Sequence, residues 1–292
     1  MREPEIELLC SQLAAYYVFP DTANEIATVL RTRQSEGAYE VADDEEFAAR
    51  VTADLQSVNG DKHLRLLYSA EEVKETGEES AWDPVAYKKE AEEDAFGITK
   101  IERLKGNIGL LELRLLHDAE IATPAVTAAM TLIAHTEALI IDLRNNVGGD
   151  PNTVALICSY LFDEPTHLND IYNRPEDSTR QFWTLPHVPG PKFGGKKPIY
   201  VLTSSRTFSG AEELSYNLQQ LERATLIGET TRGGAHPGDR YRVGPHLKSA
   251  VPNGRAINPI SGTNWEGVGV VPHIAVPADE AFDIAYKKAL EA

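Results

Sequence analysis

Short apolar segments that alternate with helix-compatible segments constrain the fold of this chain most strongly. The apolar runs lie at 108–116, 138–143, 199–203 and 224–228, and the helix-compatible stretches lie near 124–136, 151–162 and 210–222. Strands that alternate with helices form βαβ units, whose parallel sheet is covered by helices on both faces. The pattern therefore predicts an α/β core over residues 106–292.

The first third of the chain has a different pattern. Between residues 6 and 58, apolar residues recur at spacings of three and four, the period of an amphipathic helix. Three such segments predict an N-terminal helical bundle over residues 1–60. We expect residues 61–105 to connect it to the core, with a charged, solvated insertion at 71–94 that is helical from Val85 onward.

A long excursion separates two of the predicted strands at residues 163–198, and it contains several Pro and Gly residues. Connections of this length are usually functional lids or poorly ordered segments. We therefore expect one or the other here.

Charge and composition exclude several classes of function. The net charge of −17 argues against a nucleic-acid partner, which needs clustered cations, and against an anionic membrane surface. The sequence shows neither a signal-peptide pattern nor an apolar run long enough to span a bilayer. Cys10 and Cys158 lack CxxC spacing, so we expect buried free thiols and a cytoplasmic location. The histidines show no HExxH or HxH pattern and the glycines no nucleotide-binding motif, so we expect no metal and no cofactor.

Two junctions between a predicted strand and the following helix carry the candidate chemistry, at residues 142–150 and 203–213. In open α/β sheets, ligands bind outside the carboxyl ends of the strands. At a helix start, Ser209 lies where developing negative charge is favoured, and the N–H of Gly210 can donate to an oxyanion. Gly148 and Gly149 permit the backbone conformations that aim a second N–H at the same point. The alternative is that Ser209 is only an N-cap and that the glycines only make a turn.

Four segments in order resemble the tail-specific (C-terminal-processing) serine peptidase superfamily. They are DLRNNVGG at 142–149, TSSRTFSGAEE at 203–213, IGETTRGG at 227–234 and NWEGVGVVP at 264–272. The helical leader and GDKHL at 60–64 resemble the branch that includes interphotoreceptor retinoid-binding protein and its bacterial relatives. No segment reads as the PDZ domain of the processing peptidases.

The resemblance implies a crotonase-like (ClpP/crotonase-type) α/β core in which Ser209 is the nucleophile. Gly210 and one of the pair Gly148 and Gly149 would form the oxyanion hole. Many members use a lysine base, but here Gly234 stands where that lysine would be, so a Ser-Lys dyad is not expected.

Tricorn-like members use a histidine from the N-terminal part and a glutamate near the C-terminal end, which resemble His63 and Glu266 here. A histidine is a suitable base for a serine hydroxyl, and a nearby carboxylate can orient the polar network. His236, downstream of the nucleophile, is the rival base.

The sequence thus predicts a serine peptidase that cuts exposed or flexible segments of peptides or unfolded proteins. One alternative is a non-catalytic binder of an apolar small molecule. Another is a hydrolase of small amides or esters, because the same site can perform either acyl transfer.

Overall fold

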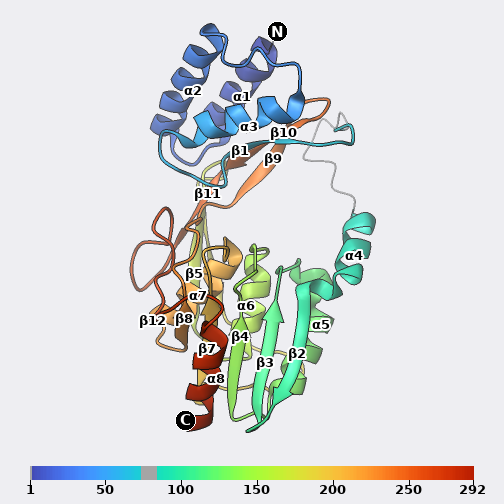
Figure 1. The fold of residues 1–292 in the computed structure, drawn as a ribbon, viewed down its shortest axis with the longest axis vertical. Coiled ribbons are helices and arrows are strands. Elements are labelled where there is room, and N and C mark those ends of the chain that lie inside the picture. Colours follow the sequence, from blue (N-terminus) through green and yellow to red (C-terminus); the bar gives the residue numbers. More distant parts are fainter. Residues whose placement is uncertain (1, 74–83) are drawn as a thin grey trace. The chain divides into compact units, whose positions relative to one another are not determined.

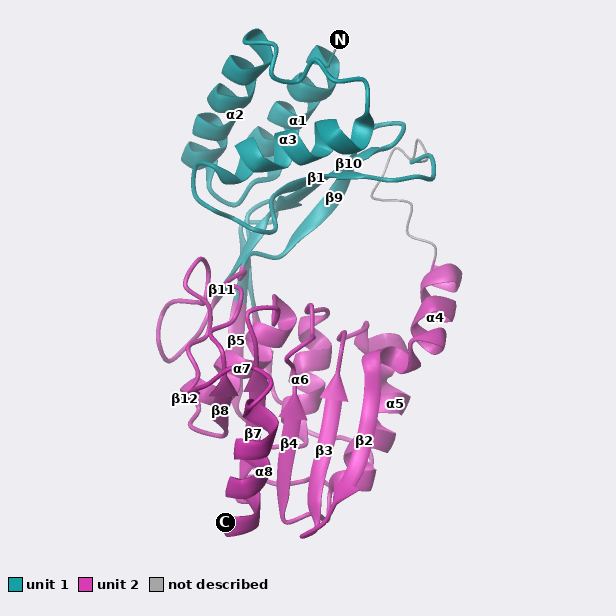
Figure 2. Ribbon diagram, in the orientation of Figure 1, with its two compact units in different colours: residues 1–83, 171–180, 236–256 teal, residues 84–170, 181–235, 257–292 magenta. Residues whose placement is uncertain are grey.

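The computed structural model describes residues 2–73 and 84–292, and the chain folds into two compact units. Unit 1 contains Met1–Asp83, Ile171–Arg180 and His236–Ala256, and unit 2 contains the remaining ranges Pro84–Asp170, Gln181–Ala235 and Ile257–Ala292 (Figure 2). Part of the predicted charged insertion, residues 74–83, lies outside the described residues. The chain therefore returns to unit 1 twice after leaving it.

Unit 1 combines three helices with a small antiparallel sheet. The helices are α1 (Glu3–Tyr16), α2 (Pro20–Ser35) and α3 (Asp44–Gln56), and the strands are β1 (Arg65–Tyr68), β9 (Gly238–Gly244) and β10 (Leu247–Pro252), in the order β1-β10-β9. The apolar positions at helical spacing, such as Leu13, Leu30 and Phe47, are fully buried in one core with Val251 of β10. Asp43 begins α3 as an N-cap, because its side chain accepts the N–H of Glu46.

Unit 2 contains a six-stranded sheet in the order β12-β8-β7-β4-β3-β2. Its strands are β2 (Ile98–Leu104), β3 (Ile108–Leu113), β4 (Ala138–Asp142), β7 (Ile199–Thr203), β8 (Thr225–Gly228) and β12 (Ile274–Ala275). β2 is antiparallel to β3, and the other neighbours are parallel. The predicted α/β class is confirmed as a mixed α/β unit with one antiparallel edge.

Helices cover both faces of this sheet (Figure 1). They are α5 (Ala119–Ile133), α6 (Pro151–Ser159), α7 (Gly210–Gln220) and α8 (Ala281–Glu291). The helix α4 (Pro84–Glu93) and a short 3₁₀ turn, Ala95–Gly97, precede β2. Ala281 and Ala285 of α8 pack against β3, β4 and β7. Figure 1 shows α8 in front of the strands and α5, α6 and α7 behind them. None of the helices among the described residues is long and apolar enough to cross a membrane.

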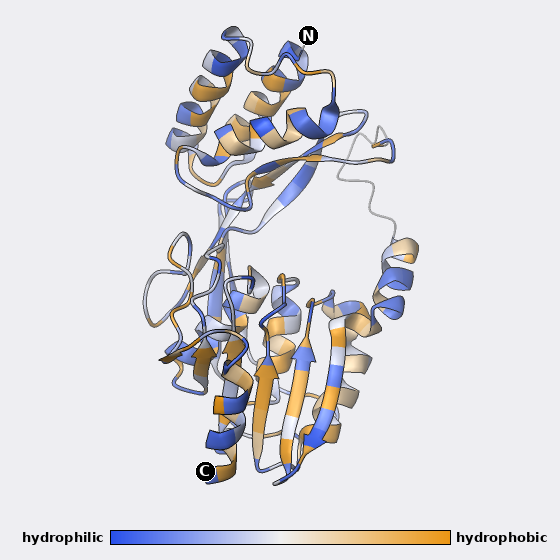
Figure 3. Cartoon of the chain, viewed as in Figure 1, coloured by the Kyte–Doolittle hydropathy of each residue, from blue (hydrophilic) through white to orange (hydrophobic). Residues whose placement is uncertain are grey.

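The two central strands, β4 and β7, are buried along their whole length. Before Asp142 and Thr203 at their ends, their residues are apolar or aromatic without alternation, as Figure 3 shows for β4, because both faces of a parallel sheet are covered. β4 and β7 are parallel neighbours, with Asp142 opposite Leu202. The junctions that follow them therefore lie at the same edge of the sheet.

The excursion at 163–198 contains two strands, so the expectation of a poorly ordered segment is wrong over those strands. β5 (His167–Asn173) and β6 (Ser178–Trp183) form a sheet with β11 (Gly254–Ile257) in the order β11-β5-β6. The boundaries between the two units fall within these strands. Sequence spacing alone does not reveal this pairing, because β11 follows β5 by more than eighty residues.

Candidate active site

Ser209 lies between β7 and α7 in a conformation that serine rarely adopts. Its φ of 53° and ψ of −123° place it in a region that strongly favours glycine. An ordinary N-cap residue takes an extended conformation with negative φ. The side chain is half-buried, so its hydroxyl is held at a helix start without being enclosed.

The buried carboxylate of Glu212 holds this conformation in place. One oxygen accepts the backbone N–H of Ser209 at 2.9 Å and that of Gly234 at 2.9 Å, and the other accepts the N–H of Gly233 at 2.6 Å and the hydroxyl of Thr231. Burial raises the pKa of Glu212 above its ordinary value, while these donors act to lower it. Glu212 was not among the predicted site residues, although Ser-x-x-Glu at a helix start signals a carboxylate that reaches back to the first N–H.

The glycine pair after β4 lies directly beside the serine. Gly148 and Gly149 have φ values of 108° and 134°, and a Cβ on Gly148 would come within 2.6 Å of the Cβ of Ser209. The N–H of Gly148 donates to Oδ1 of Asn146 at 2.8 Å. Within the described part of the chain, the N–H groups of Gly149 and Gly210 take part in no hydrogen bond. Gly148 therefore supplies room beside the serine, and Gly149 and Gly210 offer the available donors.

A neighbouring segment holds Gly149 in position. Leu116 forms a short parallel bridge with Gly149, donating to the carbonyl of Gly148 and accepting from Asp150. The carboxylate of Asp150 caps α6 through Asn152 and also accepts the N–H of Ala119. The geometry of the glycine pair is thus fixed from both sides.

Glu266 belongs to the same network in unit 2 as Ser209. Its carboxylate accepts the N–H of Ala235, and the indole of Trp265 donates to the carbonyl of Gly234 at 2.7 Å. Glu212 and Glu266 therefore hold successive N–H groups of the segment 233–235. Glu266 is half-buried.

The candidate bases, His63 and His236, both lie in unit 1. His236 is 5 % exposed, and its Nδ1 lies 2.8 Å from Oδ2 of Asp61, with the ring packed edge-on against Phe19. His63 is half-buried, and its backbone N–H donates to Oδ1 of Asp61 at 3.0 Å. Asp61 was not among the predicted site residues, although it lies two positions before His63.

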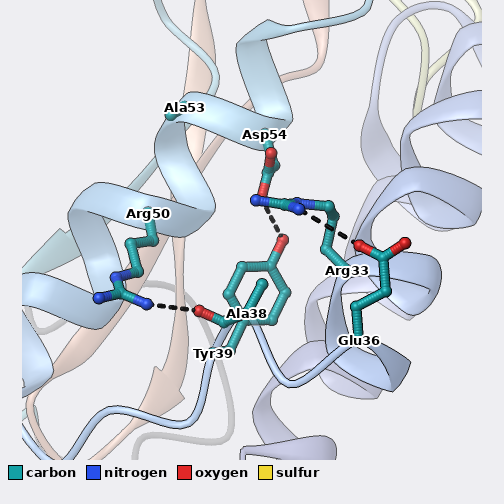
Figure 4. Close-up of a pocket in the computed structure, with 7 residues that line it drawn as sticks. All are labelled: Arg33, Glu36, Ala38, Tyr39, Arg50, Ala53 and Asp54. Atoms are coloured by element: carbon teal, nitrogen blue, oxygen red, sulfur yellow. Dashed lines mark hydrogen bonds and ion pairs between the residues drawn. The ribbon is translucent and has the colours of Figure 1, made fainter.

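A surface hollow of about 480 Å³ lies elsewhere in unit 1 and contains no candidate residue (Figure 4). Its charged groups have partners: Arg33 bonds to both Glu36 and Asp54, Tyr39 donates to Asp54, and Arg50 pairs with Glu46 outside the hollow. It therefore lacks the unpaired polar groups that a reaction centre needs.

Two family models match the chain. The model of peptidase family S41 matches residues 107–276, and the model of the N-terminal domain of S41 peptidases in eukaryotic interphotoreceptor retinoid-binding protein matches residues 5–100.

Solved structures with TM-scores above 0.6 show a similar fold. A putative peptidase from Parabacteroides merdae is 16% identical, with a TM-score of 0.68 over 99% of this chain and 96% of that one. The tricorn protease is 13% identical, with a TM-score of 0.63 over 99% of this chain and 37% of that one. The photosystem II D1 C-terminal processing protease is 20% identical, with a TM-score of 0.48 over 63% of this chain and 47% of that one. This chain thus spans less than half the length of the last two proteins.

The S41 model alone covers more than half of the sequence. The chain belongs to peptidase family S41 and is a hydrolase of the serine peptidase class.

Proposed function

We propose that the chain hydrolyses peptide bonds in exposed or flexible segments of peptides and unfolded proteins, with Ser209 as the nucleophile. The conformation of Ser209 is the observation that carries this proposal. A strained backbone of this kind persists only where its surroundings impose it, and such residues cluster at active sites. Glu212 and Gly148 impose it here.

In this mechanism, His63 takes the proton from the hydroxyl of Ser209 as its oxygen attacks the peptide carbonyl carbon. The N–H groups of Gly210 and Gly149 donate to the resulting oxyanion, and α7 contributes its favourable N-terminal field. His63 then gives the proton to the leaving amine, and water releases the acyl group by the same steps. Glu266 orients the polar network and favours the imidazolium that forms.

His63 suits the role of base better than His236 does. A base must reach the proton it removes. The imidazole of His236 is enclosed by Phe19 and bonded through Nδ1 to Asp61, whereas His63 keeps partial exposure. Ser209 belongs to unit 2 and His63 to unit 1.

The finer features of the fold are part of the same proposal. The parallel order β8-β7-β4-β3 with helices on both faces supports a crotonase-type core, and α1, α2 and α3 support the helical bundle. Cys10 and Cys158 are both free and buried, which favours a cytoplasmic setting.

A hydrolase of small amides or esters is the second candidate, because the same oxyanion donors serve either acyl transfer. A binder of apolar molecules has no need for a strained serine beside two N–H groups that have no hydrogen-bond partner among the described residues. The experiment compares the cleavage of unfolded proteins and of small esters by wild type, Ser209→Ala and Ser205→Ala. Ser205 is an exposed serine of the same junction. We expect protein fragments with wild type and Ser205→Ala only. Ester turnover without any protein cleavage would favour the second candidate, and equal activity of Ser209→Ala would overturn both.

A further inference from the structure

Among the described residues of unit 1, Asp61 is the most completely enclosed carboxylate outside the proposed reaction chemistry, with 1% of its surface exposed. Oδ2 accepts the hydroxyl of Tyr17 at 3.0 Å and lies 2.8 Å from Nδ1 of His236, and Oδ1 accepts the backbone N–H of His63 at 3.0 Å. A buried charge is tolerated only where partners of this kind compensate its lost hydration.

The partners of Asp61 come from three segments that are distant in the sequence. Tyr17 directly follows α1, His236 lies two residues before β9, and His63 lies in the turn between α3 and β1. Asn59 joins the same network, donating to the hydroxyl of Tyr17 at 2.6 Å and accepting the N–H of Asp61. One carboxylate therefore holds the turn 59–64 against two other parts of unit 1.

The two histidines depend on Asp61 in different ways. The ring of His236 is fixed by the carboxylate on one side and the edge of Phe19, at 5.2 Å, on the other. His63 is held by its backbone, because its N–H donates to the side chain of Asp61, two positions earlier in the chain. That contact fixes where the Cα of His63 lies and leaves its ring outside the bond.

The charge state of Asp61 also connects it to both histidines. Burial acts to raise the pKa of Asp61, but the hydrogen bond from His236 and the charges of His236 and His63 lower it below its ordinary value. Asp61 is therefore ionised at neutral pH, and its charge and that of His63 attract each other. Other cations near this turn are Lys62, Arg65, which donates to the carbonyl of Lys62, and Arg174, which donates to the carbonyl of Tyr17.

We propose that Asp61 is the positioning residue of the proposed base, with the buried imidazole of His236 as its fixed counterpart. This inference rests on the proposed function, in which His63 removes the proton from Ser209. In this proposal, the Asp61–His236 pair fixes the turn that carries His63 and sets the charge beside it. His236 then takes no part in the proton transfer itself.

The test compares Asp61→Asn with Asp54→Asn in the full chain. Asp54 is a matched control because it too accepts the hydroxyl of a buried tyrosine, Tyr39, in the same unit (Figure 4). We expect Asp61→Asn to lower kcat roughly tenfold or more, with little change in KM, because orientation of a base acts on the chemical step. Asp54→Asn should leave kcat unchanged.

A histidine titration by NMR gives the readout that a purely structural role would not move. The pKa of His63 should fall in Asp61→Asn and stay constant in Asp54→Asn, because only the former loses the nearby negative charge. A lower kcat with an unmoved His63 titration would overturn the proposal, as would a kcat equal to that of wild type. If Asp61→Asn fails to fold, Tyr17→Phe and Tyr39→Phe are compared instead. Each removes the one tyrosine hydroxyl that donates to Asp61 or to Asp54.

These results separate this inference from the proposed function. If wild type cleaves no peptide and Ser209 is never acylated, the proposed function fails. The titration of His63 in the two variants still shows whether Asp61 controls that residue.

Discussion

At the scale of single residues, the conformation of Ser209 makes its own prediction about stability. Strain at a positive φ costs about 1–3 kcal/mol for a residue with a Cβ, and glycine avoids that cost. We therefore expect Ser209→Gly to be more stable than Ser209→Ala, by about 1 kcal/mol after the higher entropy of unfolded glycine is subtracted. At an unstrained position such as Ser205, alanine should be the more stable replacement. Urea unfolding of the Gly and Ala variants at positions 209 and 205 measures these differences. If alanine is the more stable replacement at both positions, Ser209 is not strained.

Glu213 directly follows Glu212 in α7, and we expect its ionisation to affect the free energy of unfolding. It is 4% exposed, and burial raises its pKa to about 8 despite the nearby side chains of Asn169 and Asn217, which act to lower it. The folded state thus keeps a proton that the unfolded state releases near the ordinary pKa of 4.5. Because the folded state binds more protons between these values, the free energy of unfolding should fall as the pH rises from 4.5 to 8.

Glu213→Gln should remove this loss of stability. We expect the variant to resemble wild type near pH 4.5 and to melt at a higher temperature than wild type near pH 8. Thermal unfolding across this range measures the difference, with the exposed Glu25→Gln as a control. A constant difference between Glu213→Gln and wild type at every pH would contradict the assignment.

At the scale of elements, the segment 233–235 links two carboxylates to the nucleophile. Glu212 holds Gly233, Gly234 and Ser209, and Glu266 holds Ala235. A glutamine at position 266 can still accept the N–H of Ala235 through its amide oxygen, but it carries no charge. The two functions of Glu266, structural and electrostatic, can therefore be separated.

We expect Glu266→Gln to slow acylation by roughly tenfold or more while the melting temperature changes little. Single-turnover acylation across pH, with thermal unfolding of the same samples, measures both effects. Glu266→Ala should lower both, because it also removes the acceptor for Ala235. Unchanged acylation in Glu266→Gln would exclude Glu266 from the chemistry, and a large fall in its melting temperature would make it a structural residue.

The sequence predicts elements well where burial alone determines them. The apolar runs at 138–143 and 199–203 become β4 and β7, and the periodic segments of the first sixty residues become α1, α2 and α3. It predicts β9 and β10 poorly, because Arg240, Arg242 and Lys248 interrupt their apolar positions. These strands are stabilised by pairing with each other and with β1, which no local pattern reveals.

At the scale of the whole molecule, the path of the chain limits what the sequence can predict about the site. The residues around Ser209 come from junctions whose strands are parallel neighbours, so their proximity follows from the α/β pattern. The pair Asp61 and His236 is separated by 175 positions and depends on the second return of the chain to unit 1. A pattern within one segment contains no information about that pairing.

The two histidines of unit 1 should differ sharply in their effect on turnover. General-base assistance contributes on the order of 10²–10⁴ in rate, so His63→Ala should lower the acylation rate of Ser209 by this range. His236→Ala should have a smaller effect, because it removes a partner of Asp61 rather than the proton acceptor. Acylation rates at several pH values measure the ranking, and the reverse order would make His236 the base.

The central claim is that Ser209 is an activated nucleophile. Treatment of the folded protein with a fluorophosphonate, followed by peptide mapping, tests it most directly, since this reagent reacts with activated serines. We predict a single modified serine at Ser209, complete loss of labelling in Ser209→Ala and full labelling in Ser205→Ala. A well-folded sample that carries no label at Ser209, or that is labelled at Ser205 instead, would contradict the account.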